Sequence, residues 1–151
     1  MIKGVAIKNV VSHHDDRGFF AELLKDGEGT YYDIKQTSYS ETYPGVIKAF
    51  HWHKRQWDIW CVVKGVGQVV LYALRDDSST KGEPQVVYCG ERDMKVIVIP
   101  PGVAHGYRVL SSGPMGIIYH TTEAYDPNHP DEERIPHDSP MINFNWQTKN
   151  R

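Results

Sequence analysis

The sequence has little cysteine and no long hydrophobic run. Its two cysteines, Cys61 and Cys89, stand among apolar residues and lack the C-x-x-C spacing of metal or redox motifs, so we expect buried free thiols. No apolar stretch approaches the roughly 18 residues that a transmembrane helix needs. The N-terminus shows neither the apolar region nor the cleavage site of a signal peptide, so we expect a cytoplasmic location.

The chain also lacks a large excess of charge of one sign. Its formal net charge of −2 argues against a nucleic-acid partner, although one or two cations would suffice for a small anionic ligand. The chain has 151 residues, of which 40% are hydrophobic and 24% charged, and this composition fits one globular domain over residues 1–151. No repeat or low-complexity linker divides it, and we expect an irregular segment from about residue 126.

Helix signals are scarce, and short strands dominate the pattern. Only residues 19–29 could form a short helix, tightly bracketed by Gly18 and Gly27. Elsewhere apolar runs alternate with Gly- and Pro-rich turns at spacings of about 8–12 residues, which is typical of all-β sandwiches and barrels. The expected strands lie at residues 46–54, 58–65, 67–75, 85–90, 95–102, 105–110 and 116–125.

Histidines are plentiful, and three of them fall within two motifs. Strand alternation places His51 and His53 on one side of their strand and Trp52 on the other. The pattern Gly-x5-His-x-His-x4-Asp-x6-Gly over residues 45–65 is followed by Pro-x-Gly-x2-His over residues 100–105. Together these resemble the paired motifs of the cupin superfamily.

The cupin resemblance implies an all-β double-stranded β-helix, or jelly-roll barrel, with few short helices. In metal-binding cupins the matching positions converge on one divalent ion, and three neutral imidazoles with one carboxylate suit Fe, Mn, Ni, Zn or Cu. The motifs normally carry Glu where Asp58 stands and Asn where Val109 stands. The candidate metal ligands are therefore His51, His53, Asp58 and His105.

A second resemblance covers most of the chain. Six blocks occur in order, and together they resemble the dTDP-4-dehydrorhamnose 3,5-epimerase family, itself a group of cupins. This implies a β-barrel homodimer that acts on a nucleotide-linked 4-keto-6-deoxyhexose without a metal or cofactor. The blocks lie at residues 15–22, 45–53, 71–80, 99–111, 119–127 and 138–146.

The family's chemistry implies roles for individual residues. A base removes a proton alpha to a ketone, and an acid returns a proton to the other face. The base matches His51, the acid matches Tyr119, and His105 matches a residue that binds the sugar or stabilises the enolate. The remaining matches are substrate-binding positions: Arg17, Glu22, Gln36, Lys48 and Tyr125.

The chain departs from the family at several of these positions. Lys48 replaces an arginine, which keeps the charge and loses the bidentate fork. Asp58 replaces a lysine of the catalytic site, and His53 replaces a glutamine. The C-terminal segment whose aspartate orients the catalytic histidine has no match in this sequence.

These departures leave three hypotheses open. The first is an isomerase-class enzyme, an epimerase of a dTDP-4-keto-6-deoxyhexose in polysaccharide precursor synthesis. The second is a metal-dependent cupin enzyme of another substrate, since the changes to His53 and Asp58 are those that would create a metal site. The third is a sugar-binding cupin without activity. His51 cannot serve as both base and metal ligand, because a metal-bound imidazole has no nitrogen left to take the proton.

Overall fold

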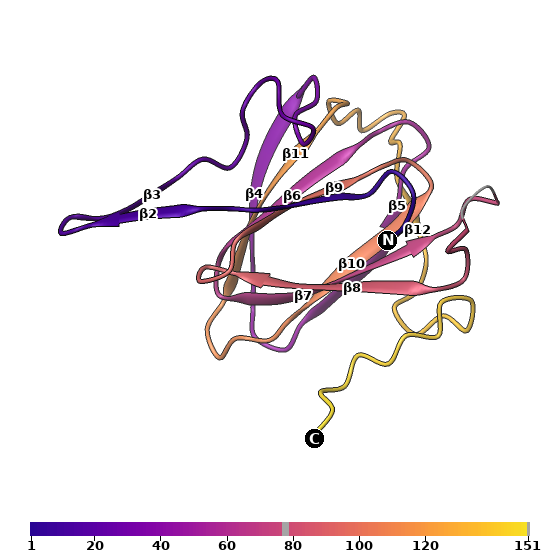
Figure 1. Cartoon of the computed structure of the whole chain (residues 1–151). Helices are drawn as coiled ribbons and strands as arrows, with labels where there is room; N and C mark the ends of the chain where they lie inside the picture. The colour runs from indigo at the N-terminus through magenta and orange to yellow at the C-terminus, as the bar shows by residue number, and fades with distance from the viewer. Residues whose placement is uncertain (77–78, 151) are drawn as a thin grey trace.

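The chain forms two antiparallel β-sheets that face each other. The computed structural model describes residues 1–76 and 79–150, so Asp77 and Ser78 of the block at 71–80 lie outside the described residues. The described part contains strands and no helix (Figure 1). The strands are β1 Ala6–Asn9, β2 Ser12–Asp15, β3 Gly18–Ala21, β4 Gln36–Thr42, β5 Ile47–Trp52, β6 Asp58–Lys64, β7 Val66–Ala73, β8 Pro84–Gly90, β9 Lys95–Ile99, β10 Val103–Val109, β11 Met115–Thr121 and β12 Glu133–Arg134.

Each of the two large sheets has five strands. The first has the order β1-β9-β6-β11-β4 and the second the order β12-β5-β10-β7-β8. Neighbouring strands within a sheet are mostly distant in sequence, which is the arrangement of a jelly roll. The seven strands expected from the sequence all form, within a few residues of the predicted bounds.

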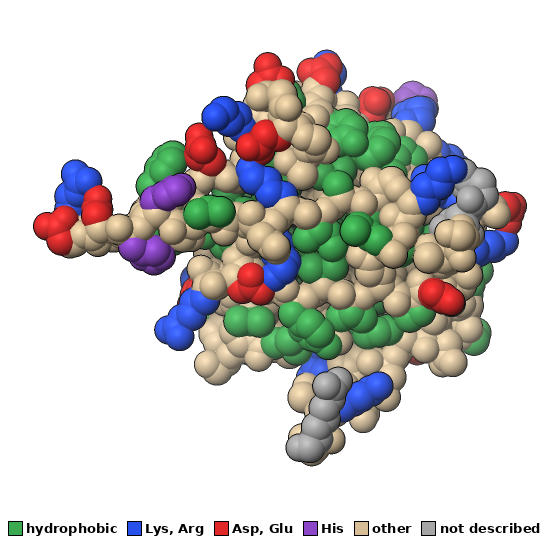
Figure 2. All heavy atoms as spheres, in the orientation of Figure 1, with side chains coloured by type: hydrophobic (Ala, Val, Ile, Leu, Met, Phe, Trp, Pro, Cys, Tyr) green, Lys and Arg blue, Asp and Glu red, His purple; other side chains and the backbone are tan. Residues whose placement is uncertain are grey.

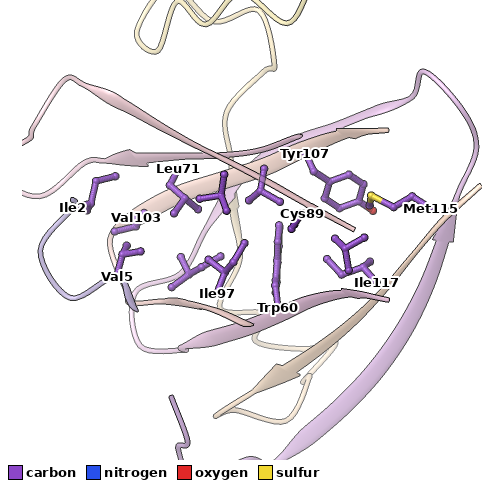
Figure 3. Packing of buried hydrophobic residues seen from close by; sticks show 14 of the residues in the cluster. Ile2, Val5, Trp60, Leu71, Cys89, Ile97, Val103, Tyr107, Met115 and Ile117 are labelled. Carbon is purple, nitrogen blue, oxygen red and sulfur yellow. The ribbon is translucent and has the colours of Figure 1, made fainter. Parts of the chain in front are cut away.

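The main core lies between the two sheets. Figure 3 shows buried side chains from both sheets, such as Leu71 and Ile97, pointing towards one another around Trp60. Strand alternation explains the pattern: in β6, Trp60 and Val62 face this core, while Ile59 and Cys61 face outwards. One end of the space between the sheets is therefore closed by apolar packing.

Both outer faces of this sandwich carry a covering segment. On the first sheet, Ile59 and Cys61 pack against Leu23 and Leu24 of the N-terminal part. On the second sheet, a cluster joins side chains of the strands to the C-terminal segment: Phe50, Val70, Tyr72 and Ala104 pack with Ile142 and Trp146. Cys61 and Cys89 are buried free thiols, as predicted.

The candidate helix at residues 19–29 does not form. Its first residues belong to β3, which pairs with β2 in a hairpin, and turns follow. Gly18 has φ of 141°, which lets the chain reverse at the hairpin turn and excludes a helix start there. The hairpin projects beyond the two sheets (Figure 1), and in Figure 2 it carries charged and histidine side chains. Among the described residues there is no helix of the length and apolarity needed to cross a membrane.

Candidate active site

A cavity of about 740 Å³ opens between the two sheets, at the end that the apolar core leaves free. This volume lies within the range of about 300–1,000 Å³ typical of small-molecule sites. Strands of both sheets line it, together with residues of the segment after β11. The predicted residues that line it are Gln36, Lys48, His51, His53, Asp58, Tyr119 and Tyr125.

The strands bring the three predicted histidines and the aspartate together. His105 of β10 lies directly opposite His51 of β5, and both point between the sheets. His53 follows the end of β5, and Asp58 begins β6 in the other sheet. One nitrogen of each histidine and one oxygen of Asp58 all lie within 4.8 Å of one another. Trp52 packs outwards, as strand alternation predicted.

Asp58 is at the centre of this cluster. Its Oδ2 atom lies 3.3 Å from His105 Nε2 and 3.9 Å from His51 Nε2, and its Oδ1 atom lies 3.5 Å from His53 Nε2. Gln56 Nε2 donates to Oδ1 at 2.7 Å, and Trp60 Nε1 donates to Oδ2 at 3.1 Å. The buried carboxylate is therefore hydrogen-bonded on both oxygens, as burial of a charge requires.

Backbone carbonyls fix the other ring nitrogens of two of the histidines. His105 Nδ1 donates to the carbonyl of Val103 at 2.8 Å, and His53 Nδ1 donates to the carbonyl of Asp131. Because a carbonyl only accepts, each Nδ1 carries the hydrogen and each Nε2 faces Asp58. The rings are therefore held in one orientation and one tautomer.

Burial and charge shift the pKa values within the cluster. Burial acts to raise the pKa of Asp58, but the close approach of the His105, His51 and His53 imidazoles holds it well below its usual value. Burial, together with the neighbouring His51, lowers the pKa of His105 to about 4. Burial also disfavours the charged form of His53, yet its contacts with Asp58 leave its pKa raised. Asp58 is thus ionised and His105 neutral at physiological pH.

The other matched residues of the cavity form its polar wall. Tyr119 lies on β11 and is half buried against the main core. Gln36 accepts a hydrogen bond from the backbone of Tyr125 at 2.9 Å, which ties that loop to β4. Lys48 Nζ donates to Ser40 Oγ at 3.3 Å. These contacts place one amide, two phenols and one ammonium group around the space.

Arg17 and Glu22 are not among the residues that line this cavity. Both lie on or next to the β2–β3 hairpin, and both are exposed. Arg17 pairs with Asp15 at 2.5 Å on the hairpin itself. Their predicted contact with the substrate therefore has no support within a single copy of the chain.

Sequence reasoning missed several residues of the site. Asp131 is the main one: its carboxylate accepts hydrogen bonds from the backbone N–H groups of Lys54, Arg55 and Gln56, and its carbonyl holds His53. Arg134 lines the cavity from β12, where it lies opposite His51 in the backbone pairing of β12 with β5. Only the charge of these residues in an otherwise irregular segment could have drawn attention to them.

Comparison with known proteins agrees with this geometry. The model of the family described as dTDP-4-dehydrorhamnose 3,5-epimerase matches residues 1–151. A spore coat polysaccharide biosynthesis protein of Bacillus subtilis, SpsL, is 55% identical over 151 residues, which is 100% of both chains.

Two solved structures share the fold. The dTDP sugar isomerase of Desulfovibrio desulfuricans is 25% identical with a TM-score of 0.87, covering 96% of this chain and 92% of that one. The 3,5-epimerase of Legionella pneumophila, in complex with dTDP-4-keto-L-rhamnose, is 25% identical with a TM-score of 0.82, covering 97% and 80%. The chain therefore belongs to the dTDP-4-dehydrorhamnose 3,5-epimerase family and is an isomerase-class enzyme with a cupin fold.

Proposed function

We propose that this enzyme epimerises a dTDP-linked 4-keto-6-deoxyhexose used in polysaccharide synthesis, with His51 as the base and Tyr119 as the acid. One observation carries the proposal: the two side chains line the same cavity but come from opposite sheets, β5 of the second sheet and β11 of the first. An epimerase must take a proton from one face of the sugar carbon and return one to the other face. Groups on opposite walls suit that requirement.

The chemistry begins with the proton alpha to the ketone. His51 takes this proton, the C–H electron pair forms a carbon–carbon double bond, and the ketone π pair moves to oxygen. The resulting enolate receives a proton from Tyr119 on the other face, which re-forms the ketone with inverted configuration. His51 and Tyr119 then return to their starting states by proton exchange with water.

Two cations of the cavity suit a diphosphate. Lys48 and Arg134 both line it, and their ammonium and guanidinium groups are the usual donors to phosphate oxygens. Arg134 Nε is also held by Glu132 at 3.0 Å. We infer that these residues bind the diphosphate and that Gln36 and Tyr125 contact the nucleoside or sugar.

The test is deuterium incorporation into dTDP-4-keto-6-deoxyglucose in D₂O, followed by mass spectrometry and NMR. His51→Asn should reduce exchange by at least about 100-fold, because general bases contribute about 10²–10⁴-fold. Tyr119→Phe should block protonation on the second face yet leave abstraction partly intact. His120→Gln, on the same strand as Tyr119, is the matched control and should behave like wild type.

Two outcomes would contradict the proposal. Wild-type protein that binds the nucleotide sugar but exchanges no proton would indicate a sugar-binding protein without activity. Exchange that survives in His51→Asn would assign the base to another residue.

We further propose that the chain forms a homodimer through the β2–β3 hairpin. The hairpin exposes Phe19 and Phe20 beyond the sheets, and a second copy would cover them. If Arg17 binds the nucleotide, as the family resemblance implies, it would then do so in the cavity of the partner. Light scattering should give the mass of a dimer for wild type and a shift towards monomer for the double variant Phe19→Ser and Phe20→Ser. A wild-type monomer at all concentrations would refute this proposal.

A further inference from the structure

Three buried side chains of the cluster form a unit that the proposed epimerisation does not use. His53, Asp58 and His105 have exposed fractions of 6%, 2% and 1%. Gln56 donates to Asp58 and lies 3.3 Å from His53 Nε2, so both have a hydrogen-bond partner. His105 Nε2 is buried and has no such partner among the described residues. Buried polar atoms normally have one, so this nitrogen calls for an explanation.

The orientation of the His53 and His105 imidazoles explains why His105 Nε2 has no hydrogen-bond partner within the described part of the chain. Each donates through Nδ1 to a backbone carbonyl, so the Nε2 atoms of His53 and His105 aim at the carboxylate of Asp58. In the neutral ring of His105 the Nε2 atom carries a lone pair, which repels the oxygens of an ionised carboxylate. A positive charge between them would turn the repulsion into attraction. A single proton can be shared by only two of the atoms, whereas a metal ion can be shared by all three residues.

The distances fit a metal ion. Ligand atoms about 2.0–2.2 Å from a metal lie roughly 2.8–3.6 Å from each other at octahedral or tetrahedral angles. His105 Nε2 lies 3.3 Å from Oδ2 of Asp58 and His53 Nε2 lies 3.5 Å from its Oδ1, both within that range. His51 Nε2 is farther from Asp58, at 3.9 Å.

The surrounding hydrogen bonds also separate His51 from the other two histidines. Metal-ligating histidines almost always donate a hydrogen bond from the N–H of their second ring nitrogen to a carbonyl, a carboxylate or water. His53 and His105 both donate to backbone carbonyls, but no such bond holds His51 among the described residues. His51 is also more exposed to the cavity, with 29% of its side chain accessible.

We propose that His53, Asp58 and His105 bind one divalent transition-metal ion, and that His51 is left outside this ligand set to act on the substrate. Two imidazoles and a carboxylate suit Fe, Mn, Co, Ni or Zn and leave further coordination positions open. The ion binds at the side of Asp58 that faces the imidazoles. Its binding replaces the contact between the side-chain amide of Gln56 and His53 Nε2. The site is thus prepared by the fold and needs no new segment to complete it.

The function of the ion rests on the proposed epimerisation. Lysine is the residue that the family resemblance places where Asp58 stands, so the cation of that position is missing from this chain. The ion restores a positive charge there, at a site whose residues His53 and Asp58 line the cavity. When His51 takes the alpha proton, the electron pair moves to the ketone oxygen and gives an enolate; an ion held by His53, Asp58 and His105 would supply positive charge to stabilise that oxygen.

The test measures the metal directly. Protein purified without a nickel column is stripped with EDTA, reloaded separately with Mn²⁺, Fe²⁺, Co²⁺, Ni²⁺ and Zn²⁺, desalted and analysed for elements. We expect about one ion per chain for at least one metal. At a free metal concentration of about 100 Kd, the melting temperature should rise by about 5–11 °C.

Variants identify the ligands. His53→Gln and Asp58→Asn should each weaken binding more than 100-fold, because loss of even a supporting partner typically costs about 10–100-fold. His51→Asn should bind the metal as wild type does, while losing proton exchange. His129→Gln, at an exposed histidine outside the cavity, is the control. Circular dichroism checks that each variant is folded.

The outcomes separate this inference from the proposed function. Failure of every metal to bind would overturn the inference even if proton exchange persists. Stoichiometric metal in a protein without exchange would support the inference and contradict the proposed function. Loss of metal in His51→Asn would make His51 a ligand, and would overturn the assignment of His51 as the free base.

Discussion

Replacing Asp131 with alanine should loosen the turn that carries Gln56 and weaken the placement of His53. The carboxylate accepts hydrogen bonds from three successive backbone N–H groups, those of Lys54, Arg55 and Gln56, at 2.9, 2.8 and 2.9 Å. The substitution removes all three at once but keeps the backbone carbonyl that accepts from His53. In the variant, the three N–H groups of the turn have to form their hydrogen bonds with water instead.

The magnitude follows from the kind of bond that is lost. A hydrogen bond to a charged group contributes about 1.5–3 kcal/mol, but three bonds to one carboxylate are not additive, and water replaces part of them at this half-exposed position. We expect a loss of about 2–4 kcal/mol of unfolding free energy, which lowers the melting temperature by about 5–15 °C in a chain of this size.

The dependence on pH checks the same reasoning. Partial burial acts to raise the pKa of Asp131, yet the N–H groups of Lys54, Gln56 and Arg55 hold it below its usual value. A lowered folded-state pKa stabilises the protein fully above the unfolded pKa of about 3.9, and this stabilisation is lost as pH falls through the folded value. The difference between wild type and Asp131→Ala should be fully present above about pH 5 and shrink below about pH 4.

The assay is urea unfolding followed by tryptophan fluorescence. Asp126→Ala is the matched control, because its carboxylate lies in the same segment and accepts one backbone hydrogen bond, from Asn128, besides an exposed contact with His129. The control should lose less than about 1 kcal/mol. Equal losses in both variants, or a loss in Asp131→Ala that does not change in acid, would refute the reasoning.

Three further predictions concern the rest of the chain. Trp146→Ala should destabilise the protein by about 3–5 kcal/mol, because Trp146 is buried against Phe50 and covers the second sheet. Calorimetry measures this, and a loss below about 1 kcal/mol would contradict the packing. Burial raises the pKa of Cys61 to about 11 and that of Cys89 to about 12. Both thiols should therefore react with Ellman's reagent at pH 8 only after unfolding. Rapid labelling of the folded protein would contradict this prediction, because it would show that one thiol is accessible. Arg134→Ala should raise the KM for a dTDP sugar about 10-fold while changing kcat little, and an unchanged KM would remove Arg134 from diphosphate binding.

The strands that the sequence revealed are those buried in the sheets. In β9, Lys95–Ile99, an apolar run is buried on both faces and is visible without any partner. β4, Gln36–Thr42, was missed because it is polar and lies at the edge of the first sheet, where only β11 pairs with it. β1 is also an edge strand, and the β2–β3 hairpin lies outside both sheets. At such positions the pairing depends on a neighbour that the local sequence does not reveal.

The candidate site also has a part that local sequence patterns predict and a part that depends on distant packing. Strand alternation and motif spacing were enough to place His51, His53 and His105 on one side, because period-two alternation is a local property. The contribution of Asp131 could not be predicted, since it depends on where the irregular C-terminal segment lies. That position is set by the packing of side chains such as Trp146 against the second sheet.

The hydrogen bond from His53 to the carbonyl of Asp131 joins residues 78 positions apart. Closing so long a loop has an entropic cost that only the completed packing of both ends can offset. Sheets built from such distant pairs form slowly compared with locally connected folds. The orientation of His53 depends on the same long-range pairing that brings β12 beside β5, so a refolding chain gains this part of its site only together with that edge of the second sheet.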